Sequence, residues 1–245
     1  MPTILAIETA TARCSVALVK EQNLLAECTL NLSRSHATHL PEMVKEVMRF
    51  AETEWSDVTG IAVSVGPGSY TGLRIGVSTA KAIAFAHEKP LIGVNSLHGL
   101  AQLVLPIMAA HDWVCPLIDA RRDEVYTAAF RKEGDGLVCE RETIALTTDR
   151  LQDWLLGNRE RHDSKVWLVG DGAAKSLLPL QNAGLETIQC LPDTDFYPNA
   201  RAIAACITEF LEVDPQTIRD LEPFYYKAFT AAKPSRSIRE RTPQS

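Results

Sequence analysis

Short apolar runs alternate with longer amphipathic segments along most of the chain. Three apolar runs separated by short polar turns open the sequence, a pattern typical of an antiparallel meander. Later apolar runs are each followed by a segment with a hydrophobic period near 3.6 residues, which predicts a strand and then a helix. In the first half we expect strands at 4–7, 14–20, 24–32, 61–65 and 90–94, and helices at about 38–52, 72–87 and 96–110.

The first of these helices has a continuous apolar stripe and a proline, Pro41, which we place in its first turn. Ser96 is the expected N-cap of the third helix, and Thr148 that of a later one. The second half repeats the same order of elements. We expect strands at 114–118, 125–130, 137–144, 166–169 and 186–191, and helices at about 148–156, 173–182 and 199–212.

The order βββαβαβα therefore occurs twice, without a residue-level repeat. This predicts an α/β protein of two related domains. Residues 1–110 form the first domain, closed by residues 218–232, and residues 111–217 form the second. Residues 233–245 are a basic, flexible tail with two interpretations, a solvated chain end or a contact with nucleic-acid phosphates.

A glycine-rich loop between the strand at 61–65 and its helix is the most distinctive stretch, Gly66-Pro-Gly-Ser-Tyr-Thr-Gly-Leu-Arg-Ile-Gly. It lacks the Lys-Ser or Lys-Thr of a phosphate-binding P-loop, the spacing of a dinucleotide fingerprint and the Gly-x-Ser-x-Gly of a nucleophile elbow. Small residues then recur every four positions, at Gly72, Gly76, Ala80 and Ala84. Such a ridge lets another helix approach closely, so we expect a partner helix to pack against it.

Composition narrows the class of protein. The chain of 245 residues is 46% hydrophobic and 23% charged, as is ordinary for a globular protein, and its net charge of -6 argues against a broad basic nucleic-acid face. The six cysteines include no C-x-x-C pair and are expected to be buried free thiols. Without a signal-peptide pattern or an apolar run of about 20 residues, a cytoplasmic protein is expected.

Several short sequence motifs, spread over nearly the whole chain, resemble those of the TsaB (YeaZ) family. They are Ile4-Leu-Ala-Ile-Glu-Thr-Ala-Thr, Cys14-Ser-Val-Ala-Leu, the glycine stretch 66–76, Asp119-Ala-Arg-Arg-Asp-Glu-Val-Tyr, Gly170-Asp-Gly-Ala and Pro223-Phe-Tyr-Tyr. The resemblance implies the actin-like ATPase fold, of the ribonuclease H-like type. It also implies a bacterial cytoplasmic protein that works with a homologue, TsaD, and a small ATPase, TsaE.

TsaD-type proteins carry the catalytic metal and transfer a threonylcarbamoyl group to adenosine beside the anticodon of tRNAs that read codons beginning with A. The resemblance thus implies a non-catalytic scaffold that binds TsaD, reaches tRNA only through the complex, and also forms homodimers. This chain offers His98 and Gln102 where TsaD-like members have an H-x-x-x-H metal pair. His36 and His39 have the wrong spacing for a zinc pair, so we expect no metal site.

In the actin-like fold, two hairpin turns and a later glycine loop surround a nucleotide. The matching positions here are 8–13, 119–124 and 170–174, with Asp119, Gly170 and Gly172 as candidate nucleotide-binding residues. The first turn lacks glycine, so the chain is expected to have no cofactor of its own, with ATP or ADP and Mg²⁺ entering only in the complex. An actin-like small-molecule kinase or ATPase, or a glycoprotease-like metallohydrolase, remains the alternative.

The expected partner surface combines the first helix with the helix behind the glycine loop. Two amphipathic helices from each of two related subunits can form a four-helix layer. The residues expected at this interface are Leu40, Met43, Val44, Val47, Gly72, Arg74, Ile75, Gly76, Thr79, Ala80 and Ile83.

Overall fold

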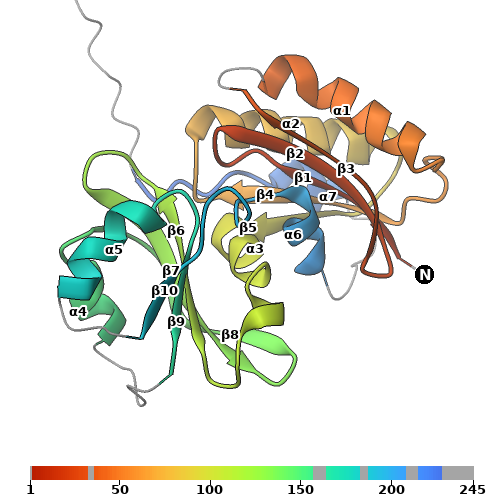
Figure 1. The fold of residues 1–245 in the computed structure, drawn as a ribbon. Helices are drawn as coiled ribbons and strands as arrows, with labels where there is room; N and C mark the ends of the chain where they lie inside the picture. The colour runs from red at the N-terminus through yellow and green to blue at the C-terminus, as the bar shows by residue number, and fades with distance from the viewer. Residues whose placement is uncertain (1, 33–35, 157–163, 183–186, 208–214, 228–245) are drawn as a thin grey trace, which may run out of the picture.

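The computed structural model describes residues 2–32, 36–156, 164–182, 187–207 and 215–227, which form two lobes, each built on a five-stranded sheet (Figure 1). The first half contains β1 (Thr3–Glu8), β2 (Arg13–Lys20), β3 (Asn23–Asn31), α1 (His36–Phe50), β4 (Gly60–Gly66), α2 (Tyr70–Ala86), β5 (Leu91–Asn95) and α3 (Ser96–Gln102), then a 3-10 turn, η1 (Leu105–Ile107). The second half contains β6 (Trp113–Asp119), β7 (Glu124–Glu133), β8 (Gly136–Thr147), α4 (Leu151–Leu156), β9 (Val166–Val169), α5 (Ala173–Asn182), β10 (Ile188–Cys190), α6 (Ala200–Ala205) and α7 (Pro215–Asp220).

The two sheets have the same topology. Their strand orders are β3-β2-β1-β4-β5 and β8-β7-β6-β9-β10. In each, the first three strands pair antiparallel, and the last two are added parallel to the first strand. The duplicated βββαβαβα order expected from the hydrophobic pattern is therefore confirmed.

Helices cover both faces of each sheet. α1 and α2 lie on the outer face of the first sheet, and α4 and α5 on the outer face of the second (Figure 1). The helices between the lobes are exchanged: α3 of the first half packs on the second sheet, through Leu97 and Leu100 against Val114 and Ile118. In turn, α6 of the second half packs Ile203 and its neighbours on the first sheet. Each lobe thus obtains one of its covering helices from the other half of the chain.

The last described segment returns to the first lobe. Ile218 of α7 is buried in the core beneath α2. Lys81 Nζ of α2 donates hydrogen bonds to the carbonyl oxygens of Arg219 (2.5 Å) and Leu221 (3.1 Å). The N–H of Phe224 donates to Val65 O at 2.7 Å. We call residues 221–227 the C-terminal strap; residues 228–232 and the basic segment 233–245 lie outside the described residues.

Three helix ends differ from the sequence expectation. α1 begins at His36, so Pro41 lies inside the helix and not in its first turn. Asn95, not Ser96, caps α3, because its Oδ1 accepts hydrogen bonds from Leu97 N (2.8 Å) and His98 N (3.3 Å). α4 begins at Leu151, three residues after the expected cap Thr148.

Helix length was overestimated where the apolar pattern continued beyond the helix. α3 ends at Gln102, and residues 105–107 form a separate 3-10 turn with no buried residue, so the helix does not continue to about residue 110. α6 ends at Ala205, and the remainder of the expected helix, to Glu212, falls largely outside the described residues. α7 was not expected at all. None of the described helices is both long and apolar enough to cross a membrane.

The cysteines are free, as expected, but not uniformly buried. Cys14 and Cys115 are fully enclosed, whereas Cys139 on β8 is exposed. Burial raises the pKa of the Cys115 thiol to about 12, although Thr127 Oγ1 lies 3.1 Å from its sulfur. Such thiols are unreactive at neutral pH.

Candidate partner-binding face

The glycine-rich loop between β4 and α2 packs against the turn between β1 and β2. A Cβ atom on Gly68 would overlap the carbonyl of Ala10, and Ser69 N donates a hydrogen bond to that carbonyl at 2.6 Å. Ser69 Oγ in turn caps α2 by accepting from Gly72 N at 3.3 Å. The glycines are needed because two backbone segments of the same chain touch.

The small-residue ridge of α2 faces the same turn. A Cβ on Gly72 would overlap the carbonyl oxygen of Thr9, and one on Gly76 would overlap Thr9 Oγ1. Ala80 and Ala84, one and two turns further along, have no exposed surface. The expectation that a partner helix packs on this ridge is therefore wrong, because the ridge is already covered by the chain's own β1–β2 turn and sheet.

The apolar stripe of α1 is likewise occupied within the chain. Leu40, Met43, Val44 and Val47 are 5% exposed or less and pack in the core of the first lobe. With Gly72, Gly76 and Ala80, seven of the eleven residues expected at the interface are thus buried. An apolar stripe shows which side of a helix is covered, and here the cover is the chain's own sheet.

The opposite side of α2 is open to solvent. Its outer face consists of exposed Arg74, Ser78, Ala82 and Phe85 with half-buried Ile75, Thr79 and Ile83. Ser78, Ala82 and Ala86 form a second ridge of small residues at intervals of four, and Phe85 beside it is 75% exposed. The sequence carried this signal as clearly as that of the buried ridge. Periodicity alone could not tell which ridge faces outward.

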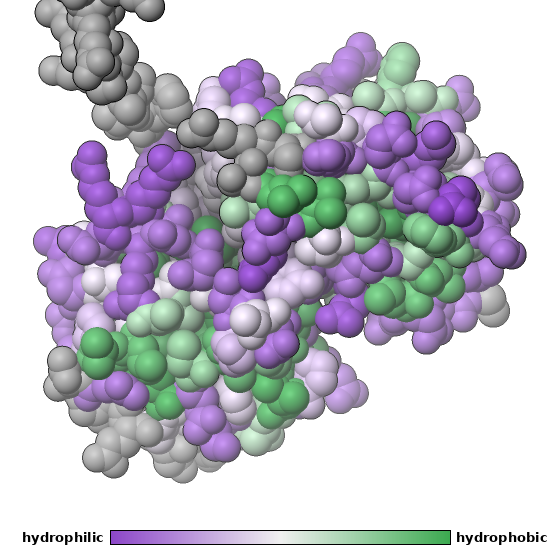
Figure 2. Space-filling model, turned by 45° about the horizontal axis from the view of Figure 1, so that its top comes forward, coloured by the Kyte–Doolittle hydropathy of each residue, from purple (hydrophilic) through white to green (hydrophobic). Residues whose placement is uncertain are grey.

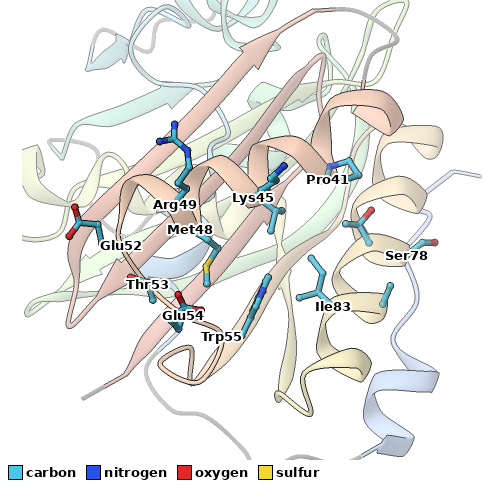
Figure 3. A pocket seen from close by; sticks show the side chains of 13 residues that line it. Pro41, Lys45, Met48, Arg49, Glu52, Thr53, Glu54, Trp55, Ser78 and Ile83 are labelled. Atoms are coloured by element: carbon cyan, nitrogen blue, oxygen red, sulfur yellow. The ribbon is translucent and has the colours of Figure 1, made fainter.

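A groove of about 870 Å³ lies between α1 and α2 on this side of the molecule. Its walls come from Val44, Lys45 and Met48 of α1, from residues 52–55, and from Ser78, Thr79, Ala82 and Ile83 of α2. Figure 3 shows Trp55 standing between Met48 and Ile83. The Trp55 indole stacks on the His87 ring with centroids 4.1 Å apart, which fixes one end of the groove.

Hydrophobic side chains gather in separate patches on both lobes, with hydrophilic side chains between them (Figure 2). The outer face of α2 and the adjoining groove combine apolar walls with a rim that contains Lys45, Arg49, Glu52 and Glu54. An apolar centre with a charged rim is the usual anatomy of a protein–protein interface. This face is therefore the candidate functional surface.

The residues expected to bind nucleotide are engaged within the chain. Burial opposes ionisation of Asp119, but Lys175 Nζ and the N–H of Arg121 bind its carboxylate, so that its pKa is lowered. Gly170 and Gly172 pack on the backbone of Leu117, and Gly172 N donates to Leu117 O at 3.0 Å. Both hydrogen bonds fall on Oδ1 of Asp119, whose side chain is 45% exposed, and the glycines have a structural role. This geometry lends no support to nucleotide binding by the chain alone, which stays a prediction.

The carboxylate of the first turn is inaccessible. Glu8 is fully buried, and its Oε1 accepts hydrogen bonds from Ala10 N (2.5 Å) and Ser64 Oγ (3.0 Å). Burial raises the pKa of the Glu8 carboxyl to about 7, against the lowering effect of these two donors. A carboxyl group held in this way supports the turn on which the glycine loop packs, and it cannot reach a bound cation.

Because its folded-state pKa is raised, Glu8 makes stability depend on pH. Between the ordinary pKa of 4.5 and about pH 7 the native protein holds a proton that the unfolded chain has lost. The free energy of unfolding is therefore expected to fall by roughly 3 kcal/mol as pH rises through this window. Glu8→Gln keeps the acceptor oxygen and cannot ionise, so urea unfolding of this variant should lack that slope. An identical slope in both proteins would contradict the assignment.

The histidines are not arranged around a metal. His98 stacks on Phe130 with centroids 5.3 Å apart, and Gln102 Nε2 lies 3.2 Å from its Nε2. Burial lowers the pKa of His98. His36 packs against the β1–β2 turn, with Nε2 3.2 Å from Arg13 O. Within the described part of the chain, no three His, Cys, Asp or Glu residues are grouped so as to hold a metal ion.

Comparison with known proteins identifies the family. Residues 24–210 match the family model of TsaD, tRNA N6-adenosine threonylcarbamoyltransferase. The tRNA threonylcarbamoyladenosine biosynthesis protein TsaB of Escherichia coli is 36% identical over 170 residues, which are 69% of this chain and 71% of that protein. The chain belongs to the TsaB (YeaZ) family. The resemblance noted in the sequence is thereby confirmed.

Solved structures agree on the fold. A Pseudomonas aeruginosa protein, described as uncharacterized with similarity to peptidase YEAZ, superposes with a TM-score of 0.73 at 25% identity, covering 93% of this chain and all of that one. EutJ of Carboxydothermus hydrogenoformans shares the fold at 10% identity, with a TM-score of 0.54 over 83% of this chain and 89% of that one. The two-domain actin-like fold expected for the family is confirmed.

Proposed function

We propose that this protein takes part in tRNA threonylcarbamoyladenosine biosynthesis as a non-catalytic subunit that binds a TsaD-type transferase. The observation that carries the proposal is the open face of α1 and α2, with an apolar groove of about 870 Å³ beside an exposed ridge of small residues. TsaD-type proteins match the same family model, so the partner has related elements with which to form a layer of packed helices.

The internal engagement of the charged residues supports an accessory role. The carboxylates that would serve a nucleotide or a metal in an actin-like enzyme are here buried, at Glu8, or ion-paired, at Asp119. Catalysis in such enzymes depends on carboxylates positioned toward the reacting phosphate and its metal. A chain that uses them to hold its own turns is suited to positioning a partner.

The same open face would accept a second copy of this chain when TsaD is absent, since related subunits can share one mode of packing. TsaE, and ATP or ADP with Mg²⁺, are then components of the complex with TsaD, and tRNA is its substrate. Of the eleven interface residues expected from the sequence, only Arg74, Ile75, Thr79 and Ile83 retain a place in this proposal, joined by Ser78, Ala82 and Phe85.

The test is reconstitution. We expect that purified TsaD, TsaE, tRNA and the substrates of threonylcarbamoyl transfer yield modified adenosine only when this chain is added, measured by nucleoside mass spectrometry. This chain with TsaE, but without TsaD, should give no product. Product in that second mixture would show that the chain itself is the transferase, and equal product without the chain would remove the need for a scaffold.

A further inference from the structure

The turn between β6 and β7 presents two exposed arginines in an uncommon backbone conformation. Arg121 and Arg122 have φ angles of 67° and 56°, in the left-handed region that glycine and asparagine adopt most readily. Within the described ranges neither guanidinium forms an ion pair. Two long cationic side chains at positions that favour small residues indicate a role other than forming the turn.

Two lysines hold the backbone of this turn. Lys175 Nζ donates to the carbonyl oxygens of Arg122 (3.1 Å) and Glu124 (2.7 Å), and Lys227 Nζ to that of Ala120 (3.2 Å). The same ammonium groups pair with Asp119 and Glu124. The turn is thereby fixed, while its two guanidinium groups remain free to meet an anion.

Exposed aromatic rings adjoin the turn through the C-terminal strap, the blue segment that runs from α7 toward the second lobe in Figure 1. Tyr225 packs on Tyr70 with ring centroids 4.8 Å apart, and Arg74 lies over Tyr70 at 5.2 Å. Tyr226 approaches Tyr126 of β7 at 6.4 Å. Phe224 is 62% exposed and Tyr225 47% exposed, so the strap offers uncovered ring faces between two arginine-bearing elements.

The charges beside the turn are mixed. Asp119 and Glu124 are neutralised by Lys175 and Lys227, and the three arginines Arg74, Arg121 and Arg122 lie near three exposed carboxylates, Asp123, Asp171 and Glu222.

We propose that the β6–β7 turn and the C-terminal strap form a binding surface for unpaired nucleotides of RNA. Phosphates meet Arg121 and Arg122, and bases stack on Phe224 and Tyr225. Arginines interleaved with exposed aromatic rings are the means by which proteins hold single-stranded nucleic acid. The inference rests on the proposed function, because tRNA is the RNA which that function supplies. Arg121, Arg122 and the strap lie outside the residues that line the α1–α2 groove, whereas Arg74 adjoins both surfaces. The inference assigns this chain a direct contact with a tRNA loop.

The first experiment removes the cations and eases the backbone. Arg121→Asn with Arg122→Gly deletes two charges and places in the turn the residue types that favour positive φ, so folding should be preserved. Fluorescence anisotropy with a labelled, unmodified tRNA transcript is expected to show at least about tenfold weaker binding to the full chain. The slope of log affinity against log salt should fall by about 1.4, for two lost phosphate contacts. Lys20→Ala with Arg201→Ala, at two exposed cations on other surfaces, is the charge-matched control and should change neither quantity comparably.

The second experiment tests stacking. Tyr225→Leu is expected to weaken RNA binding about tenfold, whereas Tyr225→Phe should restore it because a ring face remains. Absence of RNA binding by the wild-type chain, or equal affinity in all these variants, overturns the inference. So does loss of TsaD binding, measured separately by pull-down, with RNA affinity unchanged, because the surface would then belong to a protein partner. If wild-type protein binds RNA but no TsaD, the proposed function fails instead.

Discussion

The double substitution Ser78→Arg, Ala82→Arg is expected to abolish binding of TsaD while the protein still folds. Ser78 and Ala82 are exposed on the outer ridge of α2 and also line the groove beside α1. Two long charged side chains there would keep a partner helix from approaching and would leave charges in an apolar contact. An unpaired charge buried in such a contact costs roughly 2 kcal/mol or more, so affinity should fall by at least about thirtyfold per substitution.

Size-exclusion chromatography of the co-expressed proteins, together with calorimetric titration, measures this effect. The matched control is Leu178→Arg, an exposed apolar residue on α5 of the other lobe, which should leave binding unchanged. The melting temperature of the Ser78→Arg, Ala82→Arg variant should stay within a few degrees of the wild type, as is usual for exposed positions. An intact complex with the double variant would place the interface elsewhere.

Replacement of Gly76 by alanine is expected to destabilise the protein by about 2–3 kcal/mol, although the same change in an exposed helix would stabilise it by up to about 1 kcal/mol. The reason is steric. The added methyl group would overlap Thr9 Oγ1, and Thr9 is fully buried in the turn that packs on α2. The helix and the β1–β2 turn would have to separate, which opens a gap in the first lobe.

A second substitution decides whether that contact is the cause. Thr9→Ala removes the overlapping oxygen, and the nearest remaining atom, Thr9 Cβ, would then lie 3.3 Å from the new methyl group. The Thr9→Ala, Gly76→Ala double variant should therefore recover most of the lost stability in denaturant unfolding, with a coupling energy above about 1 kcal/mol. If the two effects simply add, Gly76 has another role. TsaD binding by the double variant should remain normal, because neither residue is exposed.

The sequence predicted the architecture well because each half of the chain follows a local rule. Alternating apolar runs define strands, 3.6-residue stripes define helices, and their order, βββαβαβα twice, predicts two related sheets. The strand order is the same in both sheets, as that duplication requires. The packing of a helix on a sheet from a distant part of the chain could not be predicted in this way. Nothing in the local pattern of α3 or α6 shows that each covers the sheet of the other half, because an apolar helix face fits either sheet.

The candidate partner-binding face shows the same limit of prediction from local patterns more clearly. The four-residue spacing of small residues on α2 was visible in the sequence, but two such ridges exist, and only packing decides which one is buried. Gly72 and Gly76 lie against Thr9, some sixty residues away in the chain, and that contact leaves Ser78 and Ala82 outside. The burial of Glu8, like the presentation of Arg121 and Arg122 beside the strap, also depends on residues distant in sequence. The order of elements and the family were thus determined by the sequence itself, because both can be recognised from hydrophobic periodicity and short motifs. Which side of each element remains for a partner was decided by tertiary structure, because burial results from contacts between distant segments.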